Sequence, residues 1–247
     1  MKIAIVGHGT TGSFVAEFAK ARGHELSIVD PHAEVAHHKS LSAQALEGCQ
    51  IAIDFTSPKS ALNNINLLAK YGVGIVMGTT GWYDELEKVR TLVEQQEIGF
   101  IYGHNFSIGV SLFYEVVRNA ARLINKFEEY DVAGLELHHN HKKDSPSGTA
   151  QALTEILLQE ITRKTGLISD KLEREPKENE LHFASVRCGG IPGTHKIIFD
   201  SDVDTITLEH QARNRKGFAL GAVLAAEWLE KKKGFYSVND LTASLFS

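Results

Sequence analysis

The first half of the chain alternates short apolar runs with longer amphipathic segments. The apolar runs are rich in β-branched residues, which is typical of buried strands in a parallel sheet. The segments between them repeat apolar residues at helical spacing, and Ser57-Pro58 has the residue types preferred at the start of a helix. This alternation predicts βαβ units with right-handed crossovers. The predicted strands are residues 2–6, 25–30, 49–55, 73–77 and 98–102, and the predicted helices are a segment closed by Gly23, residues 57–71 and residues 84–96.

The pattern changes in the second half of the chain. A helix with one apolar face is predicted at 111–126, a strand at 130–138 and a helix at 147–165, whereas the polar residues 166–181 predict a loop. Three strands are predicted at 182–187, 195–199 and 205–212, and the clean alternation of the last predicts one solvent-exposed face. A helix is predicted at 218–232, and Ser237 with Asp240 fits a capping box for a last short helix. This half predicts an α+β domain with a mixed or antiparallel sheet.

A glycine-rich run, Gly7-His8-Gly9-Thr10-Thr11-Gly12, directly follows the first predicted strand and precedes a helical pattern. Strand, Gly-x-Gly-x-x-Gly and helix together are the setting that a dinucleotide-binding fingerprint requires. Gly7 then permits the tight turn, Gly9 lets a pyrophosphate approach the backbone, and Gly12 lets the helix pack against the strand. A glycine-rich turn in another α/β fold is the alternative.

Asp30 ends the second predicted strand, about 20 residues beyond the glycines. A carboxylate there accepts hydrogen bonds from the adenosine ribose hydroxyls and repels a 2′-phosphate. No arginine follows it, which favours NADH as the cofactor. NADPH stays open as an alternative, because His37, His38 and Lys39 lie close by and can offset part of the repulsion.

Polar segments also follow three other predicted strands at their carboxyl ends, where ligands of open α/β sheets bind. Each segment alone is equally well explained as a turn. Together with the glycine run, they predict the remainder of a nucleotide site. The segments are Asp54-Phe55-Thr56-Ser57, Gly78-Thr79-Thr80-Gly81 and residues 103–110, which begin Gly103-His104-Asn105-Phe106.

The densest group of reactive side chains lies in residues 136–150, Glu-Leu-His-His-Asn-His-Lys-Lys-Asp-Ser-Pro-Ser-Gly-Thr-Ala. Ser147 is the predicted N-cap of the helix that follows, so the amides of Gly148 and Thr149 point out of the helix start. Such an end attracts carboxylates through its unpaired N–H groups and the helix dipole. Lys142 and three imidazoles add positive charge just before it. The stretch predicts a cradle for a small polyanion with a proton donor beside it.

A metal site and a solvated polar loop are the simpler interpretations of this stretch. His138, His139, His141 and Asp144 are all ligand types, but adjacent strand residues face opposite sides, and no compact Cys/His spacing supports zinc. No metal is therefore expected. Charge runs usually form solvated faces, yet the strand-like run 132–137 delivers this one to a strand end, where sites concentrate.

Composition narrows the class of protein. The chain has 247 residues, 43% apolar and 23% charged, which suits a globular protein of one large or two modest domains. A net charge of −5 provides no basic footprint for nucleic acid, and no apolar run is long enough to span a membrane. Cys49 and Cys188 have no metal or redox spacing and no secretion signal is evident, so we expect reduced thiols in the cytoplasm.

Residues 136–150 resemble the signature of the dihydrodipicolinate reductase (4-hydroxy-tetrahydrodipicolinate reductase) family of the diaminopimelate route to lysine. The motif is long and specific. The segments at the strand ends and residues 187–195 also resemble family segments, so the resemblance extends over nearly the whole chain. It implies an enzyme that reduces 4-hydroxy-tetrahydrodipicolinate to tetrahydrodipicolinate with NAD(P)H and loss of water.

The resemblance also implies a domain organisation. Residues 1–107 with 216–247 form a discontinuous dinucleotide-binding domain, and residues 108–215 form a substrate-binding and oligomerisation domain of a homotetramer. The predicted fold class is α/β, a Rossmann-type doubly wound parallel sheet with a second α+β substrate domain. The implied cofactor-binding residues are Gly7, His8, Gly9, Thr10, Thr11, Gly12, Asp30, Gly78, Thr79, Thr80, Gly103, His104, Asn105 and Phe106.

The motif further implies roles in the substrate site. His138 is the expected catalytic acid, since an imidazole titrates near working pH and a dianionic substrate favours its charged form. His139 and Lys142 bind a carboxylate, and Lys142 is a second catalytic candidate that shares in proton delivery. The amides of Gly148 and Thr149 hold the other carboxylate. The expected partner is a small dicarboxylate, with no nucleic acid and no membrane.

Two functions of other kinds remain open. One is an NAD(H)-binding regulator or sensor that retains the reductase fold; a sensor needs no proton donor, so the His138/Lys142 pair disfavours it. The other is an enzyme of another Rossmann family, but the catalytic Cys or Lys-Pro motif of sugar or semialdehyde dehydrogenases is not evident. Lys143 stands where the family more often has an apolar residue, and we assign it no role.

Overall fold

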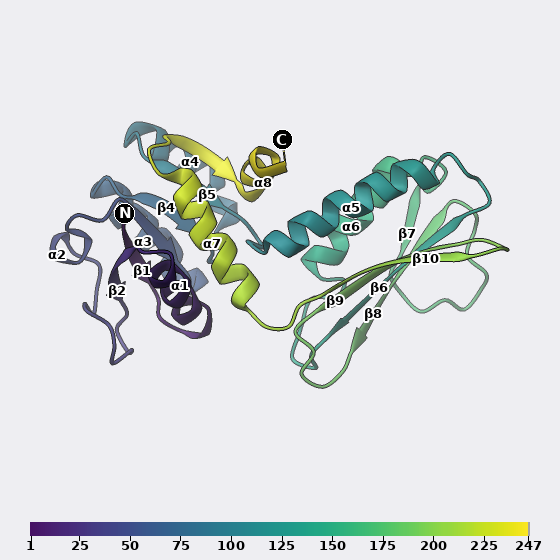
Figure 1. Cartoon of the computed structure of the whole chain (residues 1–247), viewed down its shortest axis with the longest axis horizontal. Helices are drawn as coiled ribbons and strands as arrows, with labels where there is room; N and C mark the ends of the chain where they lie inside the picture. The colour runs from purple at the N-terminus through teal and green to yellow at the C-terminus, as the bar shows by residue number, and fades with distance from the viewer. Residues whose placement is uncertain (247) are drawn as a thin grey trace. The chain divides into compact units, whose positions relative to one another are not determined.

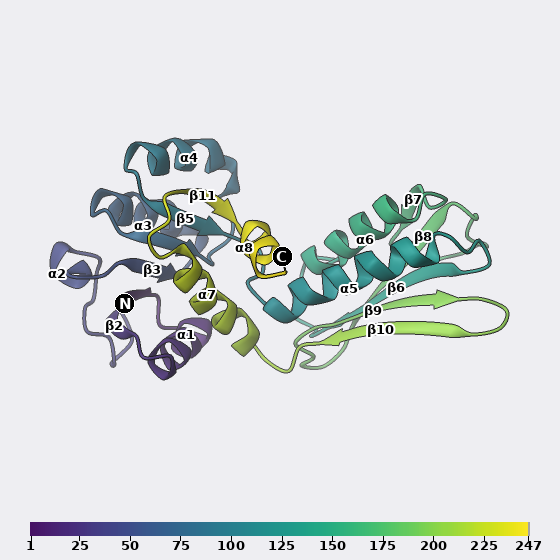
Figure 2. The same ribbon diagram turned by 45° about the horizontal axis from the view of Figure 1, so that its top comes forward.

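The computed structural model describes residues 1–246, and the chain divides into two compact units. Unit 1 contains Met1–Ile108 and the chain from Arg215 onward, and unit 2 contains Gly109–Asn214. Figures 1 and 2 show that each unit has a sheet and helices of its own. The sequence predicted a dinucleotide-binding domain of residues 1–107 with 216–247 and a second domain of residues 108–215. Residue 247 lies outside the described residues.

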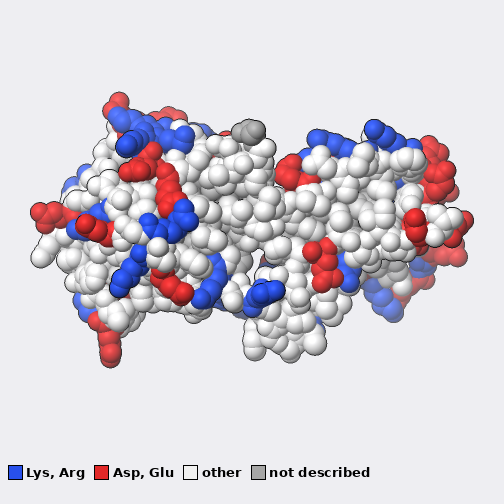
Figure 3. Space-filling model, in the orientation of Figure 1, with Lys and Arg blue, Asp and Glu red and all other residues white. Residues whose placement is uncertain are grey.

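The surface carries both signs of charge. On the face shown in Figure 3, Lys and Arg side chains lie among Asp and Glu side chains and form no continuous basic area. Among the helices of residues 1–246, none is long and apolar enough to cross a membrane.

Unit 1 is built on a six-stranded sheet whose strands are all parallel. The order β11-β5-β4-β3-β1-β2 changes direction at β1, so β1 and β3 border a topological switch point, where ligands of such sheets bind. This arrangement confirms the predicted Rossmann-type sheet. Its strands are β1 (Lys2–Val6), β2 (Glu25–Val29), β3 (Ile51–Asp54), β4 (Gly74–Met77), β5 (Gly99–Tyr102) and β11 (Gly234–Ser237).

The helices of unit 1 begin and end where the sequence supplies caps. Ser57 and Ser60 form a capping box at the start of α3, with Pro58 in the first turn. Gly23 follows the end of α1 with a φ of 83°, as its predicted role requires. The helices are α1 (Thr10–Ala21), α2 (Ala43–Leu46), α3 (Pro58–Lys70), the 3₁₀ turn η1 (Tyr83–Glu85), α4 (Leu86–Gln95), α7 (Lys216–Leu229) and α8 (Val238–Phe246).

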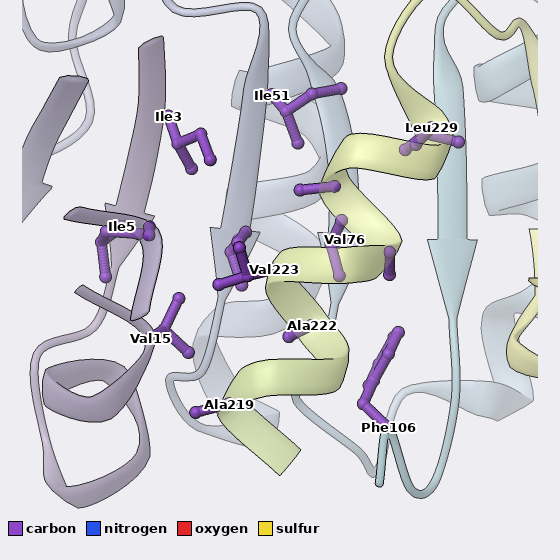
Figure 4. Packing of buried hydrophobic residues seen from close by; sticks show 14 of the residues in the cluster. Ile3, Ile5, Val15, Ile51, Val76, Phe106, Ala219, Ala222, Val223 and Leu229 are labelled. Carbon is purple, nitrogen blue, oxygen red and sulfur yellow. The ribbon is translucent and has the colours of Figure 1, made fainter. Parts of the chain in front are cut away.

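Alternate residues of the strands enter two separate cores. Ile5 of β1 packs with α1 and α7 on one face of the sheet, whereas its neighbour Val6 packs with α3 and α4 on the other. Figure 4 shows the first core, in which small side chains of α7 lie over the strands. A Cβ at Gly221 of α7 would lie 1.6 Å from the Phe106 carbonyl oxygen, so only glycine permits this approach.

Unit 2 has a five-stranded sheet with two helices on one face. Its order β10-β9-β6-β8-β7 combines the antiparallel pairs β10/β9 and β9/β6 with the parallel pairs β6/β8 and β8/β7, which confirms the predicted mixed sheet. Figure 2 shows α5 and α6 side by side, and Arg122 of α5 binds Glu160 of α6 at 2.9 Å. The elements are α5 (Ile108–Ile124), β6 (Asp131–His138), α6 (Gly148–Glu160), β7 (Gly166–Ile168), β8 (Glu180–Arg187), β9 (Thr194–Asp200) and β10 (Thr205–Gln211).

Two predictions for the second half are wrong. Residues 166–181 contain a strand, β7, because Gly166–Ile168 pairs with β8. The helix predicted at 147–165 ends at Glu160, because the backbone of Ile161 (φ −105°, ψ 91°) is extended. The strand predicted at 205–212 is present as β10, and its residues 205, 207, 209 and 211 form the exposed face that the alternation predicted, whereas Leu208 and His210 on the other face are half-buried.

Two elements of unit 1 were not predicted. The first is β11, a short run after three lysines, which extends the sheet beyond β5; Phe235 of β11 stacks on Phe100 with ring centroids 5.1 Å apart. The second is the four-residue α2, whose N-cap Ser42 accepts a hydrogen bond from the Ala45 amide. The run Gly-Phe-Tyr-Ser of β11 contains only two apolar residues, and α2 is only about one helical turn, so hydrophobic periodicity indicates neither element.

Candidate active site

The buried face of the second sheet changes from apolar to polar along its strands. Val132 and Gly134 of β6 face the core, and the next two residues on that face are Glu136 and His138. Strand register places Glu136 between Ser185 of β8 and His195 of β9. The polar end of this face therefore gathers side chains from three strands.

Glu136 is fully buried, and its two carboxylate oxygens have different partners. Oε1 accepts hydrogen bonds from the Ser147 amide (3.0 Å), the Ser185 hydroxyl (2.7 Å) and Arg187 Nη2 (3.3 Å). Oε2 faces His138 Nδ1 at 3.4 Å and His195 Nε2 at 3.5 Å. Burial opposes ionisation, but hydrogen bonds from His195, Ser147 and Ser185 outweigh it and hold the Glu136 pKa well below its ordinary value.

His138 is also buried, with 6% of its surface exposed. Burial lowers the pKa of His138 from 6.5 to about 4, although the neighbouring Glu136 carboxylate opposes this shift. The imidazole is therefore neutral at neutral pH in the free protein. The catalytic role expected from the sequence requires the protonated imidazole. Negative charge from a bound substrate would be needed to bring His138 back to that protonated form.

The start of α6 lies beside this cluster. Ser147 caps the helix as predicted, since its hydroxyl accepts a hydrogen bond from the Ala150 amide at 3.2 Å. The structure gives the amides of Gly148 and Thr149 no hydrogen-bond partner within residues 1–246. A Cβ at Gly148 would have no atom within 4 Å, so this helix start is open to a ligand, and its dipole favours an anion.

Lys142 is held by an ion pair beside the predicted cradle. Its ammonium contacts both carboxylate oxygens of Asp144, at 2.8 and 2.9 Å, and the pair lowers the Asp144 pKa against the effect of partial burial. Arg187 Nη2 donates to the Asp144 carbonyl oxygen at 2.6 Å, which ties the loop to β8. His139 follows the end of β6 and lies next to His141, with ring centroids 6.2 Å apart.

Three potential metal-ligand groups converge at the same place. Glu136, His138 and His195 offer ligand atoms that all lie within 4.8 Å of one another. The sequence could not indicate this cluster, because His195 is far from the other two along the chain. Both imidazoles are also potential proton donors to Glu136 Oε2, which is buried without a hydrogen-bond partner within residues 1–246.

The glycine run in unit 1 has the geometry that a dinucleotide requires. Gly7 has a φ of 85°, and a Cβ there would lie 2.4 Å from the Phe55 carbonyl oxygen. A Cβ at Gly12 would lie 1.9 Å from the Gly7 carbonyl oxygen, whereas one at Gly9 would meet no atom within 4 Å. The glycine run is thus tightly packed against the protein at Gly7 and Gly12 and open at Gly9, next to the start of α1. This arrangement fits a pyrophosphate. Thr10 and Thr11 form the first turn of α1.

Asp30 lies just beyond the end of β2 and links it to the glycine run. Its carboxylate accepts hydrogen bonds from the amides of His8 (2.7 Å), His32 (2.8 Å) and Ala33 (2.8 Å). Partial burial raises the Asp30 pKa, but these amides outweigh that effect and leave it lowered, so the carboxylate is ionised. The nearby Lys39 donates to the Ala33 carbonyl oxygen at 2.8 Å.

The remaining strand ends carry the other predicted cofactor residues. Gly78 lies under the Phe55 ring, and the Thr79 hydroxyl donates to the buried Asp54 carboxylate at 2.7 Å. Burial raises the Asp54 pKa against its hydrogen bonds from Thr79, Thr56 and Asn64. Thr80 and His104 are exposed, whereas Gly103 is buried against Val238. The Asn105 side chain accepts a hydrogen bond from the Ser107 amide at 2.8 Å. The Phe106 side chain is buried in the first core.

Sequence reasoning missed four residues of the cluster in unit 2: Glu136, Ser185, Arg187 and His195. Each was visible only as one residue of a motif or loop, without a role. The alternation of strand residues could have placed Glu136 and His138 on one face. The register that brings Ser185 and His195 beside them is a long-range property, which local patterns do not encode.

The two units together define a class of protein. A Rossmann-type unit with an open glycine run, and a second unit with a buried acid–base cluster beside an anion-binding helix start, are the parts of an NAD(P)H-dependent oxidoreductase. Residues 1–106 match the family model for the N-terminus of dihydrodipicolinate reductase, and residues 109–242 match the model for its C-terminus. The chain belongs to the dihydrodipicolinate reductase family, which confirms the resemblance noted in the sequence.

Individual relatives agree with this assignment. The 4-hydroxy-tetrahydrodipicolinate reductase of Christiangramia forsetii is 36% identical over 246 residues, which cover 100% of this chain and 99% of the relative. That of Archaeoglobus fulgidus is 40% identical over 77% of this chain and 74% of its own length. The dipicolinate-bound dihydrodipicolinate reductase from Paenisporosarcina sp. TG-14 has the same fold, with a TM-score of 0.74 and 24% identity over 98% of this chain and 99% of that one.

Proposed function

We propose that this chain reduces 4-hydroxy-tetrahydrodipicolinate to tetrahydrodipicolinate with NAD(P)H and loss of water, in the diaminopimelate route to lysine. The observation that carries the proposal is the contact of His138 with a buried carboxylate beside the open start of α6, in a chain of this family. Relatives that match most of the chain bear the name of this reaction. The ligand of the Paenisporosarcina structure is a dicarboxylate, which supports a dicarboxylate substrate.

Unit 2 is proposed to bind the substrate through its two carboxylates. The unpaired amides of Gly148 and Thr149 hold one carboxylate at the positive end of α6. Lys142 and His139 hold the other, and Lys142 turns from Asp144 toward the substrate. Breaking the ion pair between Lys142 and Asp144 costs little free energy, because Asp144 is exposed and surface ion pairs contribute little to stability.

His138 is proposed to complete the reduction by protonating the substrate. When bound, the dinucleotide supplies a hydride to C4 of the cyclic, α,β-unsaturated imine. The carbon next to the imine then needs a proton, and His138 donates it, with Lys142 sharing in its delivery. The substrate's two carboxylates raise the His138 pKa from about 4 toward the working pH, because opposite charge favours the protonated imidazole.

Unit 1 is proposed to bind the cofactor, with NADH preferred over NADPH. The ionised Asp30 carboxylate favours ribose hydroxyls and repels a 2′-phosphate. Of the nearby basic residues, Lys39 is engaged with the Ala33 carbonyl oxygen and His37 Nδ1 accepts from the Ile28 amide. The variant Asp30→Asn keeps an acceptor for the amides of His32 and Ala33 but removes the charge, so it should raise the activity ratio of NADPH to NADH.

The proposed enzyme is a cytoplasmic homotetramer. The exposed edge strand β10 supports assembly through unit 2, since an unpaired strand edge favours pairing with another chain. Sedimentation equilibrium of the purified chain tests the tetramer. A monomer at micromolar concentration would refute it.

The decisive test of function is NADH oxidation followed by absorbance, with the substrate generated in situ from pyruvate and aspartate semialdehyde by its synthase. Wild-type protein should turn over with NADH and, more slowly, with NADPH. His138→Gln should lose about 10²–10⁴-fold in turnover, as expected for a general acid, with little change in NADH affinity. His141→Gln is the matched control, because His141 is exposed in the same loop. Tight NADH binding without any turnover would favour the sensor instead.

A further inference from the structure

The Glu136 carboxylate has no role in the reaction as described so far, although it is the most completely buried charged group of the site. Its Oε1 has three donors, whereas its Oε2 is buried without a hydrogen-bond partner within residues 1–246 and faces two imidazole nitrogens at 3.4 and 3.5 Å. Both contacts are longer than an ideal hydrogen bond. Catalytic hydrogen bonds are often long in the absence of substrate and shorten in the complex.

We propose that Glu136 is a positioning residue that keeps a proton on His138 Nδ1, so that Nε2 is the nitrogen that delivers a proton to the substrate. An unprotonated Nδ1 would place its lone pair against the lone pairs of a buried carboxylate, which is electrostatically unfavourable. A protonated Nδ1 supplies the donor that Oε2 lacks. The inference rests on the proposed function, in which His138 is the acid.

His195 places a second ring nitrogen near the same oxygen. Its Nε2 lies 3.5 Å from Oε2 and 3.2 Å from the Ser147 hydroxyl, and its ring meets that of His138 edge to face with centroids 5.1 Å apart. Two imidazole donors and the three donors on Oε1 together keep Glu136 ionised. The charged and titratable groups that face His138 are then Glu136, His195, Lys142 and Arg187, of which only Glu136 favours a positive imidazole.

Gly193 keeps the other side of the ring accessible. A Cβ at this position would lie 3.1 Å from His138 Nε2 and 3.3 Å from its Cδ2. Gly193 also has a φ of 155°, which other residues rarely adopt. The ring is therefore fixed by Glu136 at Nδ1 and left uncovered by Gly193 at Nε2.

The variant Glu136→Gln tests the proposal because its amide can take only one orientation. Three donors surround Oε1, so the amide oxygen stays there and the NH₂ group replaces Oε2. Nδ1 of His138 must then accept, and the neutral ring carries its proton on Nε2. We expect turnover to fall by about 10²-fold or more, with the Michaelis constants for substrate and NADH changed less than about 3-fold.

The pH profile separates positioning from a structural role. Loss of the carboxylate charge lowers the His138 pKa, so the alkaline limb of the turnover profile should move to lower pH by about 1–3 units. His141→Gln is the control, because His141 is exposed in the loop after β6 and is not among the charged and titratable groups that face His138. Its profile should stay in place. A Glu136→Gln enzyme with wild-type turnover and an unmoved profile would overturn the proposal.

The tautomer can also be read without turnover, by ¹⁵N NMR of histidine-labelled wild-type protein at pH 7, with His138→Gln to assign the signals. The expected result is a proton on Nδ1 of His138, and a proton on Nε2 would overturn the proposal even if the variant fails to fold. Turnover that is lost with EDTA and restored with Zn²⁺ would overturn it too, since a metal ion would take the place of that proton. A wild-type protein that is inactive but has the Nδ1 tautomer would refute the reductase function and leave the geometry intact.

Discussion

Substitution of two glycines in the same run should have opposite effects, although both glycines belong to one sequence motif. One substitution should weaken cofactor binding, and the other should destabilise the fold. Gly9→Ala adds a methyl group that meets no protein atom within 4 Å, at a residue whose φ of −78° and ψ of −158° suit any side chain. Gly12→Ala adds one that would lie 1.9 Å from the Gly7 carbonyl oxygen. The first methyl group points into the space proposed for the pyrophosphate, and the second points into the protein.

The magnitudes follow from these contacts. Real Cβ atoms almost never come within 3.0 Å of such an atom, so Gly12→Ala must open the structure by roughly 1 Å. Gly7 cannot retreat, because it is itself packed against the Phe55 carbonyl oxygen. Overpacking of this kind costs about 1–3 kcal/mol, which corresponds to a Tm lower by about 2–12 °C. Gly9→Ala at the N-cap costs less than about 1 kcal/mol in the absence of cofactor.

The assays are thermal unfolding without cofactor and NADH binding by fluorescence titration. Gly12→Ala should melt early. Gly9→Ala should melt near the wild-type temperature but bind NADH about 5- to 100-fold more weakly, which is the same clash of about 1–3 kcal/mol transferred to the ligand. Gly148→Ala is the control, because its methyl group also meets no atom but lies in unit 2. An unchanged NADH dissociation constant in Gly9→Ala would refute the proposed pyrophosphate position, and a wild-type Tm in Gly12→Ala would refute the packing argument.

Three further predictions concern unit 2. The His138 pKa is about 4 in the folded protein and 6.5 ordinarily, so the free energy of unfolding should fall by up to about 3 kcal/mol as pH drops from 6.5 to 4. Urea unfolding measures this fall, and His138→Gln should show a smaller one. Lys142→Ala should raise the substrate Michaelis constant about 10- to 100-fold in initial-rate assays, since it removes a charged hydrogen bond; an unchanged constant with normal turnover would contradict the cradle. Phe183→Ala should cost about 3–5 kcal/mol in urea unfolding, because Phe183 is fully buried over Gly134, and a loss below about 1 kcal/mol would contradict that packing.

Local chemistry explains which features could be predicted from the sequence. The helix starts at Ser57 and Ser147 and the helix end at Gly23 are visible because a cap satisfies its backbone groups with nearby residues. The parallel strands of unit 1 are visible because burial on both faces makes them continuously apolar. These features depend on a few neighbouring residues, so a sequence pattern contains them.

The two strands that were missed depend on pairing with another strand. β11 is stable as a strand because it pairs with β5, more than a hundred residues earlier, and β7 because it pairs with β8. Neither has enough apolar residues to be recognised alone. The same limit applied to His195, whose function is defined by the register that β9 adopts beside β6.

A buried carboxylate is the part of the site that most depends on a rigid framework. The exposed loop 139–146 can adjust Lys142, because the loss of one surface ion pair costs little. Glu136 has no such freedom, because each of its five neighbouring donors is fixed by a strand or by the start of α6, and loss of any one leaves a charge partly unpaired in the interior. The exposed groups of the site therefore suit the proposed substrate binding, whereas the proposed proton donor requires the orientation that only the sheet can fix.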